Sequence, residues 1–215
     1  MNIIEETKRN LEKNNMKVYT VESKDEVYPL IKSLIKKEDV IGFGGSMTLE
    51  ETKVLDSLIN DGYNVLDRRK SGLTPEEIRE IYRKCFFADW FLMSSNAITK
   101  NGLLYNVDGN GNRVAALIYG PDRVIVVAGK NKIVENENEA VLRVKKIACP
   151  RNCERLDVKS YCLARGHCMS LDTGGKGLFD GCNSDTRICC NYVVSSKQKV
   201  KDRIVVILVN EELGY

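Results

Sequence analysis

Three segments that are apolar along almost their whole length restrict the folds open to this chain. They are VIGF within 40–45, RVIVVAG at 123–129 and RIVVILVN at 203–210. A strand that is apolar at every position, rather than at alternate ones, is buried on both faces of its sheet. Segments with apolar residues at helical spacing separate these strands. This alternation predicts an α/β fold with a mainly parallel sheet covered by helices on both faces.

The other elements are expected from capping residues and apolar spacing. Apolar spacing predicts helices at 3–11 and 137–146. Capping residues predict three more: one begins at Ser23, where Glu26 completes a capping box, and one begins at Thr74 and Pro75. The third runs through Leu55 and Leu58, with Thr48 and Glu51 as its cap. Further strands are predicted at YNVLD (63–67), WFLMSS (90–95), LLYNV (103–107) and VAALIYG (114–120). Cys85 falls on the apolar face of its helix and is expected to be buried.

Length and charge limit the classes of function. The chain has 215 residues, enough for one domain over 1–215 with a cysteine-rich extension at about 149–192 and a last strand at about 203–210. Its net charge of +3 is too small to predict nucleic-acid binding. The amino terminus is charged rather than apolar, and no segment has the length of a membrane span. A cytoplasmic protein is therefore expected.

A glycine-rich turn, GFGGSMTLEE at 42–51, separates a predicted strand from a predicted helix. Backbone N–H groups in such a turn can point at a bound anion. The turn is not a dinucleotide-binding fingerprint, because Met47 stands where that motif needs glycine, and it lacks the lysine of a nucleotide-binding loop. The sequence is compatible both with an anion pocket and with an ordinary tight turn that caps a helix.

A second polar segment, residues 94–121, follows a predicted apolar strand. Its polar side chains are Asn96, Thr99, Asn106, Asp108, Asn112 and Arg113, set among glycines. Ligands of open α/β sheets bind at the carboxyl ends of the strands, so these groups are candidates for a site. Asn and Gly also build ordinary turns. The segment holds three Asn-Gly or Asp-Gly pairs, more than one hairpin needs, and this excess favours a binding site.

Four segments spread along the chain share long motifs with one protein family. They are GGSMTLEET at 44–52, residues 94–121, VAGKNKIV at 127–134 and the ending VILVNEELGY at 206–215. The chain in this respect resembles the lactate-utilisation (LUD) domain family, named from operons for lactate oxidation in which its members accompany iron–sulfur proteins. That family is similar to glucosamine-6-phosphate deaminase, ribose-5-phosphate isomerase and the CoA transferases. The resemblance implies a Rossmann-like parallel sheet.

The resemblance also implies site residues. Carried over position by position, it places an anion pocket at Gly44, Gly45 and Ser46, opposite Ser95, Asn96 and Thr99. Asn112, from the polar segment 94–121, is a further candidate for anion binding. Asp108 is implied as a general acid or base, with Glu51 as a second candidate. Arg113 or Lys132 would bind a carboxylate or phosphate.

Seven of the eight cysteines lie between Cys149 and Cys190, in a glycine-rich segment with little apolar periodicity. Four thiolates can hold either zinc or a [4Fe–4S] cluster. The paired C-x2-C spacing typical of zinc is missing here, and the wide spacings favour iron–sulfur. The predicted ligands are Cys162, Cys168, Cys182 and Cys189. The alternatives are free or disulfide-linked thiols in a flexible lobe, or a catalytic thiol.

These features predict a LUD-domain protein that binds a small organic or phosphorylated anion and takes part in the use of lactate or a related 2-hydroxy acid. If the protein is an enzyme, isomerisation or acyl transfer by acid–base groups fits the candidate residues. The alternative is an accessory or electron-transfer subunit, without catalytic activity, that carries iron–sulfur or zinc and docks on an iron–sulfur redox partner. A homodimer is a prior expectation because such assemblies are common.

Overall fold

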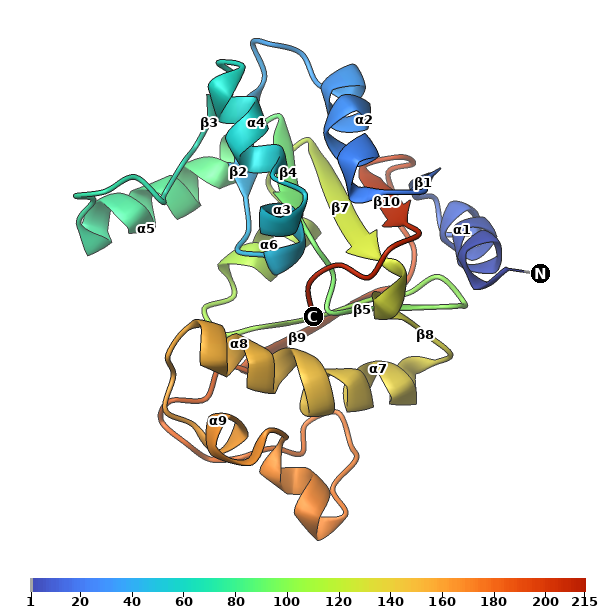
Figure 1. Cartoon of the computed structure of the whole chain (residues 1–215), viewed down its shortest axis with the longest axis vertical. Helices are drawn as coiled ribbons and strands as arrows, with labels where there is room; N and C mark the ends of the chain where they lie inside the picture. The colour runs from blue at the N-terminus through green and yellow to red at the C-terminus, as the bar shows by residue number, and fades with distance from the viewer. Residues whose placement is uncertain (1) are drawn as a thin grey trace.

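The computed structural model of the chain describes residues 2–215 and contains two sheets (Figure 1). The larger sheet has six strands in the order β1-β10-β7-β4-β2-β3, and every pairing in it is parallel. Its strands are β1 (Lys17–Val21), β2 (Val40–Phe43), β3 (Asn64–Val65), β4 (Trp90–Met93), β7 (Arg123–Gly129) and β10 (Ile204–Val209). The predicted α/β fold with a mainly parallel sheet is confirmed.

Strand β10 shows why this sheet carries helices on both faces. Ile204, Val206 and Leu208 pack in one core with α1 (Ile3–Lys13) and α6 (Asn112–Ile118). The alternate residues, Val205, Ile207 and Val209, pack in a second core with α2 (Val27–Leu34) and α4 (Val54–Asn60). Since successive side chains of a strand point to opposite faces, a central strand between two cores must be apolar throughout.

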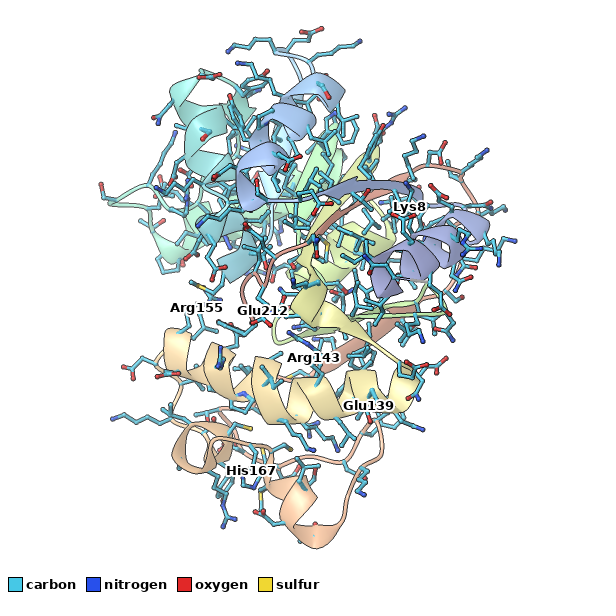
Figure 2. The ribbon with its side chains drawn as sticks, turned by 45° about the vertical axis from the view of Figure 1, so that its right-hand side comes forward. Lys8, Glu139, Arg143, Arg155, His167 and Glu212 are labelled. Carbon is cyan, nitrogen blue, oxygen red and sulfur yellow. The ribbon has the colours of Figure 1, made fainter. Side chains whose placement is uncertain are left out.

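The smaller sheet has the order β8-β5-β6-β9 and lies beside the first (Figure 1). Its strands are β5 (Ala97–Thr99), β6 (Leu104–Asp108), β8 (Ile133–Val134) and β9 (Asn191–Ser195). One helical run packs against it: α7 (Glu137–Arg143), a π turn (Val144–Ala148) and α8 (Cys149–Arg155). The helix predicted at 137–146 therefore continues into the cysteine-rich segment. Arg143 and Arg155 project from this run toward the larger sheet, whereas His167 lies on the far side (Figure 2).

One predicted strand is wrong. Residues 114–120 were expected to be extended, but they fall mostly in helix α6, which starts after Gly111 at φ +82°. The Asp108 side chain accepts hydrogen bonds from the backbone N–H groups of Arg113 (3.0 Å) and Val114 (3.3 Å), and so satisfies two free donors of the first turn. A run of apolar residues this short has no periodicity that distinguishes a helix from a strand. Here the cap formed by Asp108 favours the helix.

The helix predicted through Leu55 is also different. It is two helices, α3 (Met47–Glu51) and α4, separated by Lys53 in a left-handed conformation at φ 52°. The cap is Ser46, whose hydroxyl accepts from Leu49 N–H at 3.3 Å, and not the predicted pair of Thr48 and Glu51. The strand predicted at 63–67 is reduced to β3. Strand β1 was not predicted. The α5 helix (Pro75–Lys84) and its capping box are as predicted, and Cys85 is 3% exposed.

After α8 the chain forms α9 (Tyr161–Arg165), a 3-10 helix (Met169–Thr173) and a segment from 174 to 190 without helix or strand. All eight cysteines are free thiols, and among them only Cys190 is exposed. Over residues 2–215, no helix is both long and apolar enough to cross a membrane.

Candidate functional site

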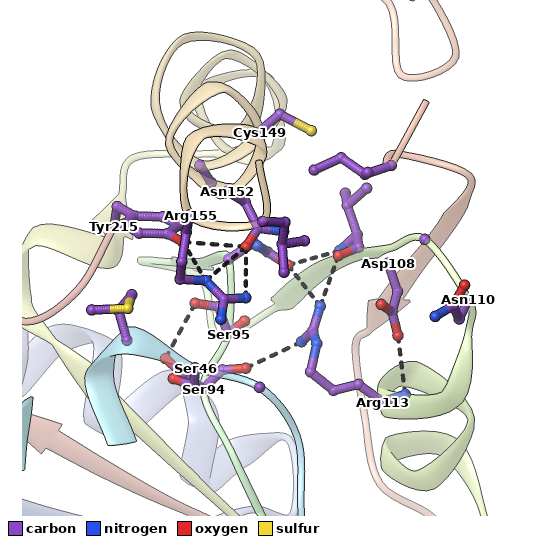
Figure 3. A pocket seen from close by; sticks show the side chains of 18 of the residues that line it. Ser46, Ser94, Ser95, Asp108, Asn110, Arg113, Cys149, Asn152, Arg155 and Tyr215 are labelled. Carbon is purple, nitrogen blue, oxygen red and sulfur yellow. Dashed lines mark hydrogen bonds between the residues drawn. The ribbon is translucent and has the colours of Figure 1, made fainter. Parts of the chain in front are cut away.

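A cavity of about 250 Å³ opens at the carboxyl ends of β2 and β4 and reaches the helical run (Figure 3). The turn after β2 contributes Gly45 and Ser46, and the end of β4 contributes Ser94, Ser95 and Asn96. The other polar walls are Asp108, Asn110, Asn112 and Arg113 around the start of α6, Lys132 after β7, Asn152 and Arg155 on α8, together with Arg68, Tyr82 and Tyr215. Chain segments far apart in sequence therefore meet at the sheet edge where ligands bind in α/β folds.

Arg113 is the centre of the hydrogen-bond network in this wall. Its Nη1 donates to Ser94 O (3.2 Å) and Asn106 Oδ1 (2.7 Å), and its Nη2 donates to Asn96 Oδ1 (3.0 Å) and Val107 O (2.7 Å). All four acceptors are uncharged, so the guanidinium is held in place without a carboxylate partner. Burial lowers its pKa. Asn106 uses Oδ1 for Arg113, and its buried Nδ2 has no partner within residues 2–215.

The two glycines of the turn have different neighbours. A Cβ on Gly44 would lie 2.8 Å from both Cγ and Cδ of Arg113, so any other residue at this position would collide with the arginine side chain. A Cβ on Gly45 would meet only the guanidinium ends of Arg68, at 3.1 Å, and Arg155, at 3.8 Å. The Gly44 N–H donates to Leu92 O at 2.9 Å and is not free for a ligand. Gly44 thus accommodates the Arg113 side chain.

Lys132 lies deep in the wall and is 3% exposed. Its ammonium donates to Thr48 Oγ1 at 2.8 Å and to Ser94 Oγ at 2.9 Å. Burial, followed by the positive charges of Arg143 and Arg113, lowers the pKa of Lys132 to about 7. Lys132 therefore exchanges a proton near neutral pH.

Two further arginines face the cavity from elements that sequence reasoning had not connected with it. Arg155 donates to Tyr215 Oη at 2.9 Å and to Asn152 Oδ1 at 2.9 Å. Arg68 stacks over Phe43, with 4.8 Å from its guanidinium carbon to the ring centre. None of Arg68, Arg113, Lys132 and Arg155 forms an ion pair in the described part of the chain.

The two predicted acid–base residues lie in different places. Asp108 lines the cavity; its Oδ2 caps α6, and its Oδ1 has no hydrogen-bond partner among the described residues. Glu51 does not line the cavity, and its carboxylate accepts from Gly214 N–H at 2.8 Å. Glu51 therefore holds the carboxyl-terminal segment that brings Tyr215 to the wall.

The remaining predicted residues mostly support the wall. Asn96 accepts from Val107 N–H at 2.8 Å, and Ser95 donates to Ala97 O at 2.8 Å. Thr99 is buried in β5 and lies outside the cavity wall, where it accepts from Leu103 N–H at 3.0 Å. Arg143, which was not predicted, donates to Asn96 O at 2.6 Å, and burial lowers its pKa to about 10. No local motif distinguishes Arg68, Arg143 or Arg155 from other basic residues in the sequence.

The four thiols predicted as metal ligands are all buried. Cys162 and Cys168 pack with Cys153, whereas Cys189 packs with Cys149. A small cavity behind the helical run is lined by Cys149, Cys162, Cys168 and Cys189; Cys182 is not among its wall residues. Between residues 2 and 215, no three Cys, His, Asp or Glu side chains are placed to hold a single metal ion.

Comparisons with known proteins give a family and a fold. A search of curated proteins finds no match. A DUF162 family protein from Deinococcus radiodurans is 16% identical, with a TM-score of 0.53 over 97% of this chain and 96% of that one. Ribose 5-phosphate isomerase A from Methanocaldococcus jannaschii and eIF2B beta from Chaetomium thermophilum, each 16% identical, have TM-scores of 0.35 and 0.36. The isomerase alignment covers 54% of this chain and 56% of the isomerase, and the eIF2B beta alignment covers 56% of this chain and 42% of eIF2B beta. The model of the LUD domain family matches residues 4–209, almost the whole length, and the chain therefore belongs to the LUD domain family.

Proposed function

We propose that the cavity binds a small organic or phosphorylated anion, and that the protein acts in the use of lactate or a related 2-hydroxy acid. The observation that supports this is the set of cations in the wall, Arg68, Arg113, Lys132 and Arg155, without ion-pair partners among the described residues. Lys132 is buried and Arg113 is partly buried. A charge buried with only neutral partners is costly, and a bound anion relieves that cost.

The cations in the wall contribute to anion binding in two different ways. The guanidinium of Arg113 already donates four hydrogen bonds to protein oxygens, so it contributes positive potential more than direct contacts. Lys132 and Arg155 have only two uncharged partners each, and they are the residues expected to touch the anion. A carboxylate or phosphate oxygen between them would accept charge-assisted hydrogen bonds.

Asp108 is the residue we propose for acid–base chemistry. Its Oδ1 is free to accept or deliver a proton, while Oδ2 is fixed at the start of α6. With an anion bound to Lys132 and Arg155, such a carboxyl group suits proton transfer on the anion's carbon skeleton, as in an isomerisation. Glu51 lies outside the wall, and its assignment as a second acid or base rests on the sequence prediction alone.

Calorimetric titration of the full chain at low salt tests anion binding. The ligands are D-lactate, L-lactate, pyruvate and inorganic phosphate, and the variant is Arg155→Gln, with Arg151→Gln as the matched control. Both arginines are on α8, but Arg151 lies outside the cavity wall. Loss of one charge-assisted contact, worth about 1.5–3 kcal/mol, should weaken binding by roughly tenfold or more in Arg155→Gln only.

Two results would contradict the proposal. One is the absence of saturable binding of any of these anions to the unaltered chain at millimolar concentrations. The other is an equal loss in Arg151→Gln, which would show that binding follows net charge rather than the cavity.

A further inference from the structure

Six of the seven thiols in the cysteine-rich segment are buried together behind the helical run. We call this group the thiol cluster; it consists of Cys149 and Cys153 on α8, Cys162 on α9, Cys168, Cys182 and Cys189. Each of these residues is at most 9% exposed, although much of the surrounding chain, from 174 to 190, has no helix or strand. Cys182 and Cys189 lie in that irregular segment, whereas the other four lie on or next to helices, so separate parts of the chain bring the six thiols together.

The thiols surround a common space. Cys149, Cys162, Cys168 and Cys189 line the small cavity together with Tyr105, Leu178 and Tyr192. Cys149 interacts directly with Cys189. Cys162 lies within electrostatic range of Cys153, Cys168, Cys182 and Cys189.

Two cations sit next to the thiol cluster. Arg187 donates to Cys189 Sγ at 3.2 Å and, through Nη1, to Cys182 O at 2.9 Å. Lys145 lines the cavity, is 5% exposed, and donates to Ser170 Oγ at 3.0 Å and Gly175 O at 3.2 Å. No carboxylate of residues 2–215 forms an ion pair with either. Buried positive charges beside thiols stabilise thiolates and any anionic centre that thiolates build.

We propose that the thiol cluster binds a [4Fe–4S] cluster through Cys149, Cys162, Cys168 and Cys189. These four line one cavity, and the net negative charge of an iron–sulfur centre with four thiolates matches Lys145 and Arg187. A single zinc ion needs its ligands to converge on one point, which no three such side chains do in the described residues. In a [4Fe–4S] cluster each thiolate binds a different iron, so the sulfurs stand farther apart, and loading would separate the Cys149 and Cys189 thiols, which are hydrogen-bonded to each other in this structure. The fourth ligand is Cys149 in place of Cys182, the residue expected from the sequence.

The cavity indicates how the cluster would enter. Its volume is about 10 Å³, close to that of one water-sized sphere, so one wall must move outward. Three sides are fixed by α7–α8, β6 and β9, whereas Leu178 and Asp180 belong to the irregular segment 174–190. Within that segment, residues 176–181 form hydrogen bonds only with one another, so their displacement leaves the hydrogen bonds of Lys145, Arg187 and Cys189 intact.

The thiol cluster also adjoins the anion cavity. Cys149 lines both cavities, and on the same helix Asn152 and Arg155 face the anion cavity. One turn of α8 therefore separates the two sites. The iron–sulfur proposal does not depend on anion binding, because its test measures iron.

The test uses the full chain purified without oxygen and then incubated with ferrous iron and sulfide. Iron and acid-labile sulfide are measured per chain, together with visible absorption and the electron paramagnetic resonance signal after reduction. We expect a brown protein with about four irons and about four sulfides per chain. Loading should also change the rate at which a protease cuts segment 174–190. An iron-free, colourless protein, stoichiometric zinc, or disulfides among these thiols would overturn the proposal.

Serine substitutions assign the ligands. Cys149→Ser, Cys162→Ser, Cys168→Ser and Cys189→Ser are expected to lower the iron content several-fold, whereas Cys182→Ser and Cys190→Ser keep it. Cys190 is the matched control, because it is adjacent to Cys189 but exposed. Circular dichroism checks that each variant is folded. Loss of iron in Cys182→Ser with retention in Cys149→Ser would overturn the assignment drawn from the cavity.

Discussion

Lys132 gives a prediction about stability that depends on pH. Burial and the neighbouring arginines lower its pKa from 10.5 to about 7, which corresponds to roughly 5 kcal/mol against the charged form in the folded chain. In the unfolded chain the lysine stays protonated up to its ordinary pKa. Between pH 7 and pH 10.5 the unfolded chain thus binds more protons than the folded one, and stability rises with pH. Below about pH 7 both forms are protonated and the full cost of burial is present.

The variant Lys132→Met removes this dependence while it keeps the volume of the side chain. We expect the difference in free energy of unfolding, unaltered chain minus variant, to increase by roughly 2 kcal/mol between pH 7 and pH 9. Urea denaturation followed by the fluorescence of Trp90, the only tryptophan and 5% exposed, measures it at each pH. The contributions of the other titrating groups are the same in both proteins, so they cancel when the two free energies of unfolding are subtracted. Parallel pH profiles for the two proteins would refute the assignment of a near-neutral pKa to Lys132.

Four other substitutions test the wall. Gly44→Ala places a Cβ 2.8 Å from the Arg113 side chain and should lower the free energy of unfolding by about 1–3 kcal/mol, whereas Gly45→Ala, which meets only flexible guanidinium ends, should change it little. Equal effects in denaturation experiments would argue against this packing. Asp108→Ala should cost about 1 kcal/mol of stability by removing the α6 cap, while Asp108→Asn keeps an acceptor and should be near neutral. A large loss in both, again by denaturation, would mean that the charge and not the cap matters.

The sequence predicted the larger sheet well because its central strands are apolar on both faces. β2, β7 and β10 could be recognised from their own residues, and so could the α5 helix from its capping box. Helix α6 could not, since a hydrogen bond from outside the segment, to Asp108, sets its conformation. β1 is a strand because β10 pairs with it, and the paired residues Lys17 and Val205 are 188 positions apart in the sequence.

The candidate site was predictable to a similar extent. Ser46 and Asn96 follow buried strands, Asp108 ends one and Arg113 comes just after a glycine turn, so their place at the sheet edge could be inferred. Arg155 reaches the cavity only because α7 and α8 form one run across the smaller sheet, and Tyr215 because Glu51 holds the end of the chain. Those relations depend on tertiary packing, which no local pattern records.

The central claim is that a cavity with unpaired cations at the carboxyl ends of β2 and β4 takes an anion. Diffraction from crystals grown with selenate, whose selenium is located by its anomalous scattering, tests it most directly. We predict one selenate in the cavity, with oxygens within hydrogen-bond distance of Lys132 Nζ and the Arg155 guanidinium. Selenate bound elsewhere, with this cavity holding none at saturating concentration, would contradict the account.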